Sequence, residues 1–244
     1  MSFYFVFAGH GDVADGRGFV ELSDGPFTSD DLDVLLARVG ARESHVILDS
    51  CNSFFVISPR KPGGRRFATP SDAAESLARR HPGVGVFLST SAEAQVYEWS
   101  ELQSGIFSHA VRSGLAGAAD ADGDSRVSYQ ELAAFVDIAA AGIRNPGYRP
   151  KVFARGPAGD GNRTLVDLNA RNLAVLAIDD PGAVRLRVRD TDGLRWVDLY
   201  KEEGASIELR LPHPLAQRME VERLRLIGKE ASVEARYRAP LLPA

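Results

Sequence analysis

The sequence predicts an α/β fold in which a mostly parallel sheet, sandwiched by helices, is followed by a small all-β, sandwich-like domain. Two short apolar runs, residues 3–7 and 46–48, are typical of parallel strands that are covered on both faces. Up to about residue 160, such runs alternate with segments whose apolar residues recur at helical spacing. Beyond that point, short alternating runs separated by turn residues predict a β-sandwich.

The first part of the chain is expected to alternate strands and helices. Turn residues at 12–16 precede a hairpin strand at 17–22, and Thr28 or Ser29 can cap the helix that follows. That helix connects the two apolar runs. The further expected elements are a helix from Pro70 to residue 80, a strand at 85–89, helices at 106–115 and 128–141, and a strand at 152–154.

We place a domain boundary near residue 160, so that residues 1–160 form the α/β domain and residues 161–244 the β-rich domain. The expected strands of the second domain are residues 184–188, 196–200, 206–211, 221–227 and 232–237. This domain carries no clustered set of histidine, cysteine or carboxylate residues, so we assign it an interaction or scaffolding role.

The composition is that of a globular protein without nucleic-acid or membrane partners. Of the 244 residues, 44% are apolar and 25% are charged, and the net charge of −4 is not gathered in blocks. No apolar stretch approaches the roughly 20 residues that a membrane span needs. The first residues lack the basic leader of a signal peptide and the single cysteine fits a reducing compartment, so we expect a cytoplasmic protein.

His10 and Cys51 each follow one of the two apolar runs near the N-terminus. In open α/β sheets, catalytic and ligand-binding groups gather beyond the carboxyl ends of the strands. Because Cys51 is the only cysteine, it belongs to no disulfide and to no cysteine-rich metal cluster. Two interpretations stay open: Cys51 is a nucleophile assisted by His10, or it is a packed core thiol and His10 is a turn residue.

Two motifs in this order resemble those of the caspase and metacaspase cysteine peptidases. They are FAGHG at residues 7–11 and LDSCNS at residues 48–53, and GIFSHA at residues 105–110 is similar to a segment of the small-subunit region of that family. The resemblance covers roughly residues 3–155 and implies a caspase-like fold for the first domain.

The resemblance implies an endopeptidase that needs no cofactor for catalysis and acts on protein or peptide substrates. Cys51 is then the nucleophile that forms an acyl-enzyme, and His10 is the general acid–base. The backbone N–H groups of Gly11 and Cys51 would hold the oxyanion. The alternatives are a catalytically inactive, caspase-like binding or regulatory module and, with less support, another thiol hydrolase such as an amidase.

Asp49 lies two residues before Cys51, a position that carries Asp in the Arg/Lys-specific metacaspases and Gln in the aspartate-specific caspases. We therefore predict cleavage after Arg or Lys, since a carboxylate beside the thiol pairs with a cation and repels an acid. The alternative is that Asp49 shapes the turn through backbone hydrogen bonds. Ser89, Tyr97 and Trp99 fall where the family forms one wall of the substrate cleft, although aromatic residues often serve packing alone.

A basic segment follows the predicted nucleophile. Its charged residues are Arg60, Lys61, Arg65 and Arg66. They are candidate self-cleavage sites, because family members are often cut in this loop during maturation. The alternative is an exposed basic loop without a function of its own.

Residues 120–131 match the twelve-residue EF-hand pattern and lie between two expected helices. The expected Ca²⁺ ligands are Asp120, Asp122, Asp124, the backbone carbonyl of Arg126, and Glu131. Ser125 departs from the pattern, because glycine normally occupies its position and allows the sharp turn. We expect a structural calcium ion here; the alternative is an acidic turn that caps a helix.

The resemblance also implies that the first domain is N-terminally incomplete, since the sheet of the family has two strands before the one that carries the histidine. No such strands precede residues 3–7 in this sequence. An apolar strand with an open edge invites aggregation. We hypothesise that a separate polypeptide supplies the missing strands or that the C-terminal domain covers the edge. In metacaspases, a second acidic residue of the basic-specificity pocket comes from that portion.

Overall fold

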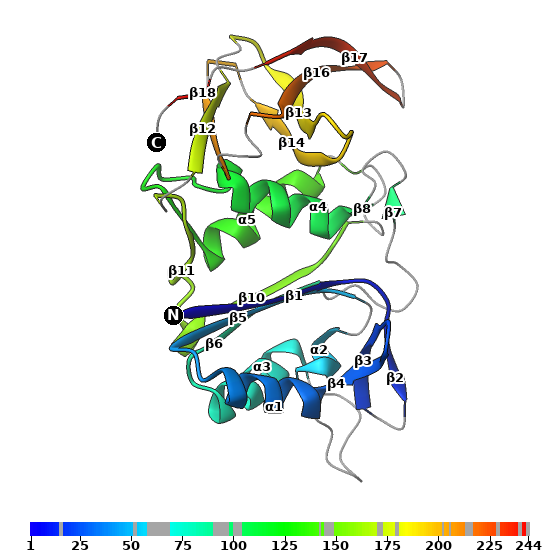
Figure 1. Cartoon of the computed structure of the whole chain (residues 1–244), viewed down its shortest axis with the longest axis vertical. Helices are drawn as coiled ribbons and strands as arrows, with labels where there is room; N and C mark the ends of the chain where they lie inside the picture. The colour runs from blue at the N-terminus through cyan, green and yellow to red at the C-terminus, as the bar shows by residue number, and fades with distance from the viewer. Residues whose placement is uncertain are drawn as a thin grey trace. The chain divides into compact units, whose positions relative to one another are not determined.

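The computed structural model is mixed α/β and forms two compact units (Figure 1). It describes residues 1–14, 17–50, 53–57, 69–89, 98–99, 104–141, 143, 149–169, 173–178, 181–201, 203–204, 206–212, 217–227, 230–238 and 241–242. The first unit comprises Met1–Glu98 and Ala140–Leu165, and the second comprises Trp99–Ala139 and Val166–Ala244. This division differs from the expected boundary near residue 160, because residues 99–139 group with the C-terminal strands.

The first unit is built on a four-stranded sheet with the order β1-β5-β6-β10. These strands are β1 (Ser2–Ala8), β5 (Glu43–Asp49), β6 (Val84–Ser89) and β10 (Val152–Arg155). The first three strands run parallel and β10 is antiparallel to β6. A partly parallel sheet, as the apolar runs predict, is therefore present.

Three helices lie on one face of this sheet, as Figure 1 shows. They are α1 (Ser29–Val39), α2 (Ser53–Val56) and α3 (Pro70–Arg80). The longer two begin in the same way: Thr28 and Thr69 are N-caps that form capping boxes with Asp31 and Asp72. Because a capping box satisfies N–H groups that a helix leaves free, it fixes where both helices begin.

A three-stranded antiparallel sheet connects β1 to α1. It consists of β2 (Gly11–Ala14), β3 (Arg17–Leu22) and β4 (Gly25–Thr28), in that order. The hairpin strand expected at residues 17–22 is confirmed as β3.

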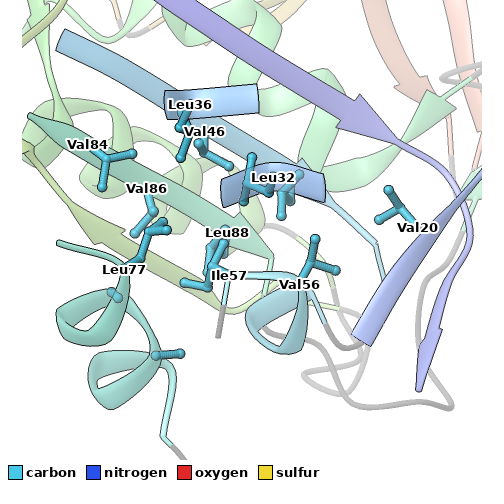
Figure 2. Close-up of a cluster of buried hydrophobic side chains, with 13 residues drawn as sticks. Val20, Leu32, Leu36, Val46, Val56, Ile57, Leu77, Val84, Val86 and Leu88 are labelled. Carbon is cyan, nitrogen blue, oxygen red and sulfur yellow. The ribbon is translucent and has the colours of Figure 1, made fainter. Parts of the chain in front are cut away.

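The core of the first unit lies between the helices and the four-stranded sheet (Figure 2). Leu32 and Leu36 of α1 and Leu77 of α3 are buried against strand residues such as Val46 and Leu88. Val20 of the hairpin sheet and Val56 of α2 extend this cluster. A buried leucine or valine side chain contributes about 1.5–3 kcal/mol relative to an exposed one, so this cluster holds helices and sheet together.

The side chains of β1 alternate between a partly buried face and an exposed face. Phe3, Phe5 and Phe7 pack against the core, whereas Tyr4 is 45% and Val6 is 64% exposed. The expectation that residues 3–7 are buried on both faces is therefore wrong. The reason is position: β1 is the end strand of the sheet, and an end strand can be apolar without being covered on both faces.

The second unit combines helices with two antiparallel sheets. Its helical segments are α4 (Ile106–Ser113), a π-helical turn (Gly114–Ala118) and α5 (Tyr129–Ala141). The last two residues of α5 belong to the first unit. One sheet has the order β15 (Ile207–Pro212), β12 (Leu173–Ile178) and β18 (Leu241–Leu242). The other has the order β14 (Arg195–Lys201), β13 (Val184–Asp190), β16 (Met219–Ile227) and β17 (Glu230–Tyr237).

Residues of both sheets contribute to one hydrophobic core, including Leu176, Leu209, Leu186 and Val221. All five strands expected between residues 184 and 237 are present. The remaining short elements are β7 (Glu98–Trp99), β8 (Ser104–Gly105), β9 (Arg126–Ser128), β11 (Thr164–Asp167) and a 3₁₀ turn (Pro157–Gly159).

Buried ion pairs connect the strands of the second sheet. Arg185 makes two hydrogen bonds to Asp198, of 2.8 and 3.1 Å. Arg187 lies 3.6 Å from Asp198 and 3.4 Å from Glu222, whose side chain is 1% exposed. Arg236 of β17 approaches the same glutamate to 2.8 Å. Removing one member would leave a buried charge unpaired, which costs about 3–5 kcal/mol.

Helix α4 packs on β14 beside these ion pairs and buries His109 there. His109 is 4% exposed, and neither ring nitrogen has a hydrogen-bond partner among the described residues. Burial lowers the pKa of His109 to about 4; Asp198 acts in the opposite direction, and Arg112, Arg185 and Arg187 lower the pKa further. The imidazole is therefore neutral at physiological pH.

Replacing His109 by leucine is expected to reduce the loss of stability in acid. The folded pKa of about 4 lies below the ordinary value of 6.5, so the neutral form is favoured in the folded protein. The contribution of the neutral His109 to the free energy of unfolding is complete above about pH 6.5. It is lost as the pH falls toward 4, and the loss is up to about 3 kcal/mol. Chemical denaturation of both proteins from about pH 7 to pH 4 measures this difference, and equal pH slopes would contradict the prediction.

Candidate active site

The carboxyl ends of β1 and β5 lie side by side. Ala8 is the register partner of Asp49, and the Gly9 N–H donates to the Asp49 carbonyl oxygen at 3.0 Å. His10 follows Ala8 by two residues, and Cys51 follows Asp49 by two residues. Cys51 itself lies outside the described residues. The pairing therefore shows only that the segments carrying His10 and Cys51 begin at adjacent strand ends.

His10 lies in the turn between β1 and β2, with an exposed side chain. Its carbonyl oxygen accepts a hydrogen bond of 3.0 Å from the Glu21 N–H, which links this turn to β3. A Cβ on Gly9 would lie 2.9 Å from the ring of Phe7, so a larger residue at that position would require this ring to shift. Gly11 begins β2 and is partly exposed.

Asp49 is buried at the end of β5, and Ser50, the next residue in the chain, is fully buried. Ser53, the first residue of α2, donates a hydrogen bond of 2.5 Å to the carbonyl oxygen of Ser89. This bond joins the segment after β5 to the last residue of β6. Ser89 was expected at the substrate cleft; its side chain is buried, and its carbonyl oxygen serves this contact.

Ser53 is a residue whose role the sequence did not reveal. It lies within the LDSCNS motif, and its spacing from the predicted nucleophile is the signal that could have drawn attention to it. Its bond to Ser89 depends on β6, which is 36 residues away in sequence, so no local pattern announces it.

Several expected site residues lie outside the part of the chain that the structure describes. They are Cys51, Tyr97, Arg60, Lys61, Arg65 and Arg66. Trp99 belongs to β7, but its side chain is outside the described part. The structure therefore brings together the stretches that carry His10 and Asp49, whereas the aromatic wall and the basic loop stay predictions.

The acidic loop of the second unit adopts a tight turn. Asp120, Asp122 and Asp124 each offer a carboxylate oxygen, and these oxygens lie within 4.8 Å of one another. Ser125 has a φ of +63°, the left-handed conformation that usually calls for glycine. The Asp120 carboxylate accepts hydrogen bonds of 3.0 Å from the N–H groups of Gly123 and Ser125, which hold the turn.

Glu131 closes the loop at its other end. Its carboxylate oxygens accept hydrogen bonds from the Ala121 N–H at 3.2 Å and the Ser128 N–H at 2.8 Å. Burial raises the pKa of Asp120, and the carboxylates of Asp124 and Glu131 raise it further, against the effect of the backbone hydrogen bonds. Carboxylates crowded in this way are suited to a hard cation with oxygen ligands.

No helix in the described ranges combines the length and the apolar character needed to cross a membrane. No protein-family model matches the chain, and no curated protein matches it either. The functional interpretation therefore depends on the residues themselves and on the sheet that carries them.

Replacing Ser53 by alanine is expected to lower the free energy of unfolding by about 1–3 kcal/mol, because the buried Ser89 carbonyl would lose its hydrogen bond from Ser53. Urea denaturation measures the change. Ser71→Ala is the matched control, since Ser71 is exposed on α3 and its replacement should change stability by no more than about 0.5 kcal/mol. Equal effects of the two substitutions would show that the Ser53 bond contributes nothing.

Proposed function

We propose that the chain is a cysteine endopeptidase that hydrolyses peptide bonds after Arg or Lys, with Cys51 as nucleophile and His10 as general acid–base. The observation that supports this most is the register of β1 and β5. Because Ala8 is opposite Asp49, His10 and Cys51 are each two residues beyond the same paired position. Catalytic groups of open α/β sheets gather beyond such strand ends.

The proposed reaction proceeds in two steps. The Cys51 thiol gives its proton to His10, and the thiolate attacks the scissile carbonyl carbon to form a tetrahedral oxyanion. The N–H groups of Gly11 and Cys51 stabilise that oxyanion, and His10 protonates the departing amine as the C–N bond breaks. Water then hydrolyses the acyl-enzyme with His10 as base. The exposed position of His10 is compatible with this exchange of protons.

The proposed specificity for basic residues depends on Asp49. Its side chain is buried at the end of β5, two residues before the proposed nucleophile. A carboxylate with little access to water attracts a guanidinium or ammonium group strongly and repels an acidic side chain. By the same specificity, the protein would cut itself after Arg60, Lys61, Arg65 or Arg66.

The chain is expected to hydrolyse peptides that end in Arg or Lys before a fluorogenic group, and not those that end in Asp. Cys51→Ala should abolish turnover. Asp49→Asn should lower kcat/KM for the basic peptides by roughly tenfold to a hundredfold, since a hydrogen bond to a charged group contributes about 1.5–3 kcal/mol. Asp24→Asn is the control, because Asp24 is an exposed turn residue of the same unit, and it should leave kcat/KM unchanged.

Three outcomes would count against the proposal. Labelling of Cys51 by iodoacetamide without turnover of any peptide would favour the inactive binding module. Activity on small amides alone would favour an amidase. A mass spectrum of the ageing protein without cuts at the basic loop, or with cuts that persist in Cys51→Ala, would contradict self-processing.

We also propose that the loop at residues 120–131 holds a structural Ca²⁺ ion. The carboxylates of Asp120, Asp122 and Asp124 lie together, and Glu131 is close to the start of the loop through its bond to Ala121. Arg126 would add its backbone carbonyl oxygen. The positive φ of Ser125 supports the proposal, because the same backbone conformation underlies the glycine of the EF-hand pattern.

Calcium titration by calorimetry should detect binding to this loop. Glu131→Gln is expected to weaken binding by roughly tenfold or more, because affinity in such loops follows the number of charged ligands. Ser125→Gly is expected to raise the free energy of unfolding by about 1 kcal/mol and to leave the calcium affinity nearly unchanged, since the left-handed conformation is present without the ion. Asp137→Asn, on the exposed side of α5 and outside the loop, is the control. A titration that shows no heat of binding for any of these proteins would contradict the proposal.

A further inference from the structure

β1 has hydrogen-bonding groups on the side that faces away from β5. The Gly9 N–H bonds to the Asp49 carbonyl, and Ala8 is the register partner of Asp49. In a parallel ladder, alternate residues direct both backbone groups to the same neighbour, so the odd-numbered residues of β1 face β5. The N–H and C=O groups of Ser2, Tyr4, Val6 and Ala8 point the other way. Within the described ranges, β1 is the end of its sheet and no strand pairs with that side.

This edge lacks the features by which proteins prevent strand addition. The segment Ser2–Ala8 contains no charged residue and no proline, and it forms seven residues of regular strand. Val6 projects an apolar side chain that is 64% exposed, whereas Tyr4 is 45% exposed, with its ring stacked on His45 and its hydroxyl donating a hydrogen bond of 2.7 Å to the Leu165 carbonyl oxygen. An edge of this kind accepts another strand readily.

We infer that β1 pairs with β1 of a second copy of this chain, antiparallel and centred on Phe5. In that register, Tyr4 lies opposite Val6 of the second copy, and Phe3 lies opposite Phe7. Tyr4 and Val6 are among the residues whose backbone groups point outward, so the register lets them exchange hydrogen bonds. The two four-stranded sheets then join into one continuous sheet.

The occupant is a second copy because the edge is complementary to itself. Read backwards, residues 3–7 keep phenylalanine at the first, third and fifth positions and exchange only Tyr4 with Val6. Cross-strand pairs of an aromatic with a β-branched side chain are favourable, and here the two Tyr4–Val6 pairs on the exposed face are of this kind. The two-fold arrangement uses the β1 edge of both copies, so association through this edge ends at a dimer.

The proposed β1–β1 interface is small, so the association has to be measured over a range of protein concentrations. A pair of seven-residue strands buries less than the about 1,200 Å² of a standard interface, and interfaces of that size belong to weak complexes. The association therefore depends on protein concentration. The inference does not depend on the proposed peptidase activity and can be tested on the Cys51→Ala protein.

Sedimentation velocity of the full chain over a wide range of concentrations provides the test. The protein is expected to change from monomer to dimer as the concentration rises. Val6→Lys should raise the dimer dissociation constant by roughly tenfold or more, because it places two like charges as diagonal neighbours in the paired strands. Val34→Lys is the matched control: Val34 is 58% exposed on α1 of the same unit, and its replacement should leave the constant unchanged.

Residue-resolved hydrogen exchange identifies the edge independently of these variants. In the dimer, the amides of Tyr4, Val6 and Ala8 should become protected, whereas those of Phe5 and Phe7 are protected at all concentrations. A chain that is monomeric throughout overturns the inference; protected even-numbered amides in such a monomer would show that the chain covers its own edge. A dimer that survives Val6→Lys, or growth into open aggregates, also overturns it. A monomer whose edge amides are unprotected would instead favour a separate polypeptide as the partner of this edge.

Discussion

The parallel pairing of β1 with β5 is the constraint on which the first unit depends. Its register agrees with packing, since Phe3, Phe5 and Phe7 meet the core in the register that places Ala8 opposite Asp49. A slip of one residue would turn the phenylalanines outward and the Tyr4 face inward, because side chains alternate along a strand. The same slip would move His10 relative to the segment that follows β5. Core packing and the candidate active site are therefore determined by one register.

Local interactions made part of the fold predictable. Thr28 and Thr69 cap their helices through residues three positions away, so the sequence near each helix start is sufficient. β12 was not expected, because the strands of the second domain were expected as alternating runs, whereas Leu173–Ile178 is apolar throughout. The end of α4 was expected at residue 115, but the helix gives way to a π-helical turn in which Gly117 has a φ of +116°. A Cβ there would lie 3.1 Å from the Glu208 carbonyl, a contact that no local pattern contains.

The same distinction applies to the functional residues. The positions of His10 and Asp49 at adjacent strand ends follow from apolar runs and from the rules of parallel sheets. The environment of His109 could not be predicted, because its charged neighbours Arg185, Arg187 and Asp198 come from strands far along the chain. For the same reason the grouping of α4 with the C-terminal strands was not expected near a boundary at residue 160.

The ion pairs of the second sheet have a consequence for heating. The cost of removing charges from water falls as the temperature rises, whereas the stabilisation from apolar burial levels off. The contacts of Arg185 with Asp198 and of Arg187 with Glu222 therefore become more favourable relative to the aliphatic core on warming. The charged face of β13, β14 and β16 therefore contributes a larger share of the stability of the second unit at high temperature than at low temperature.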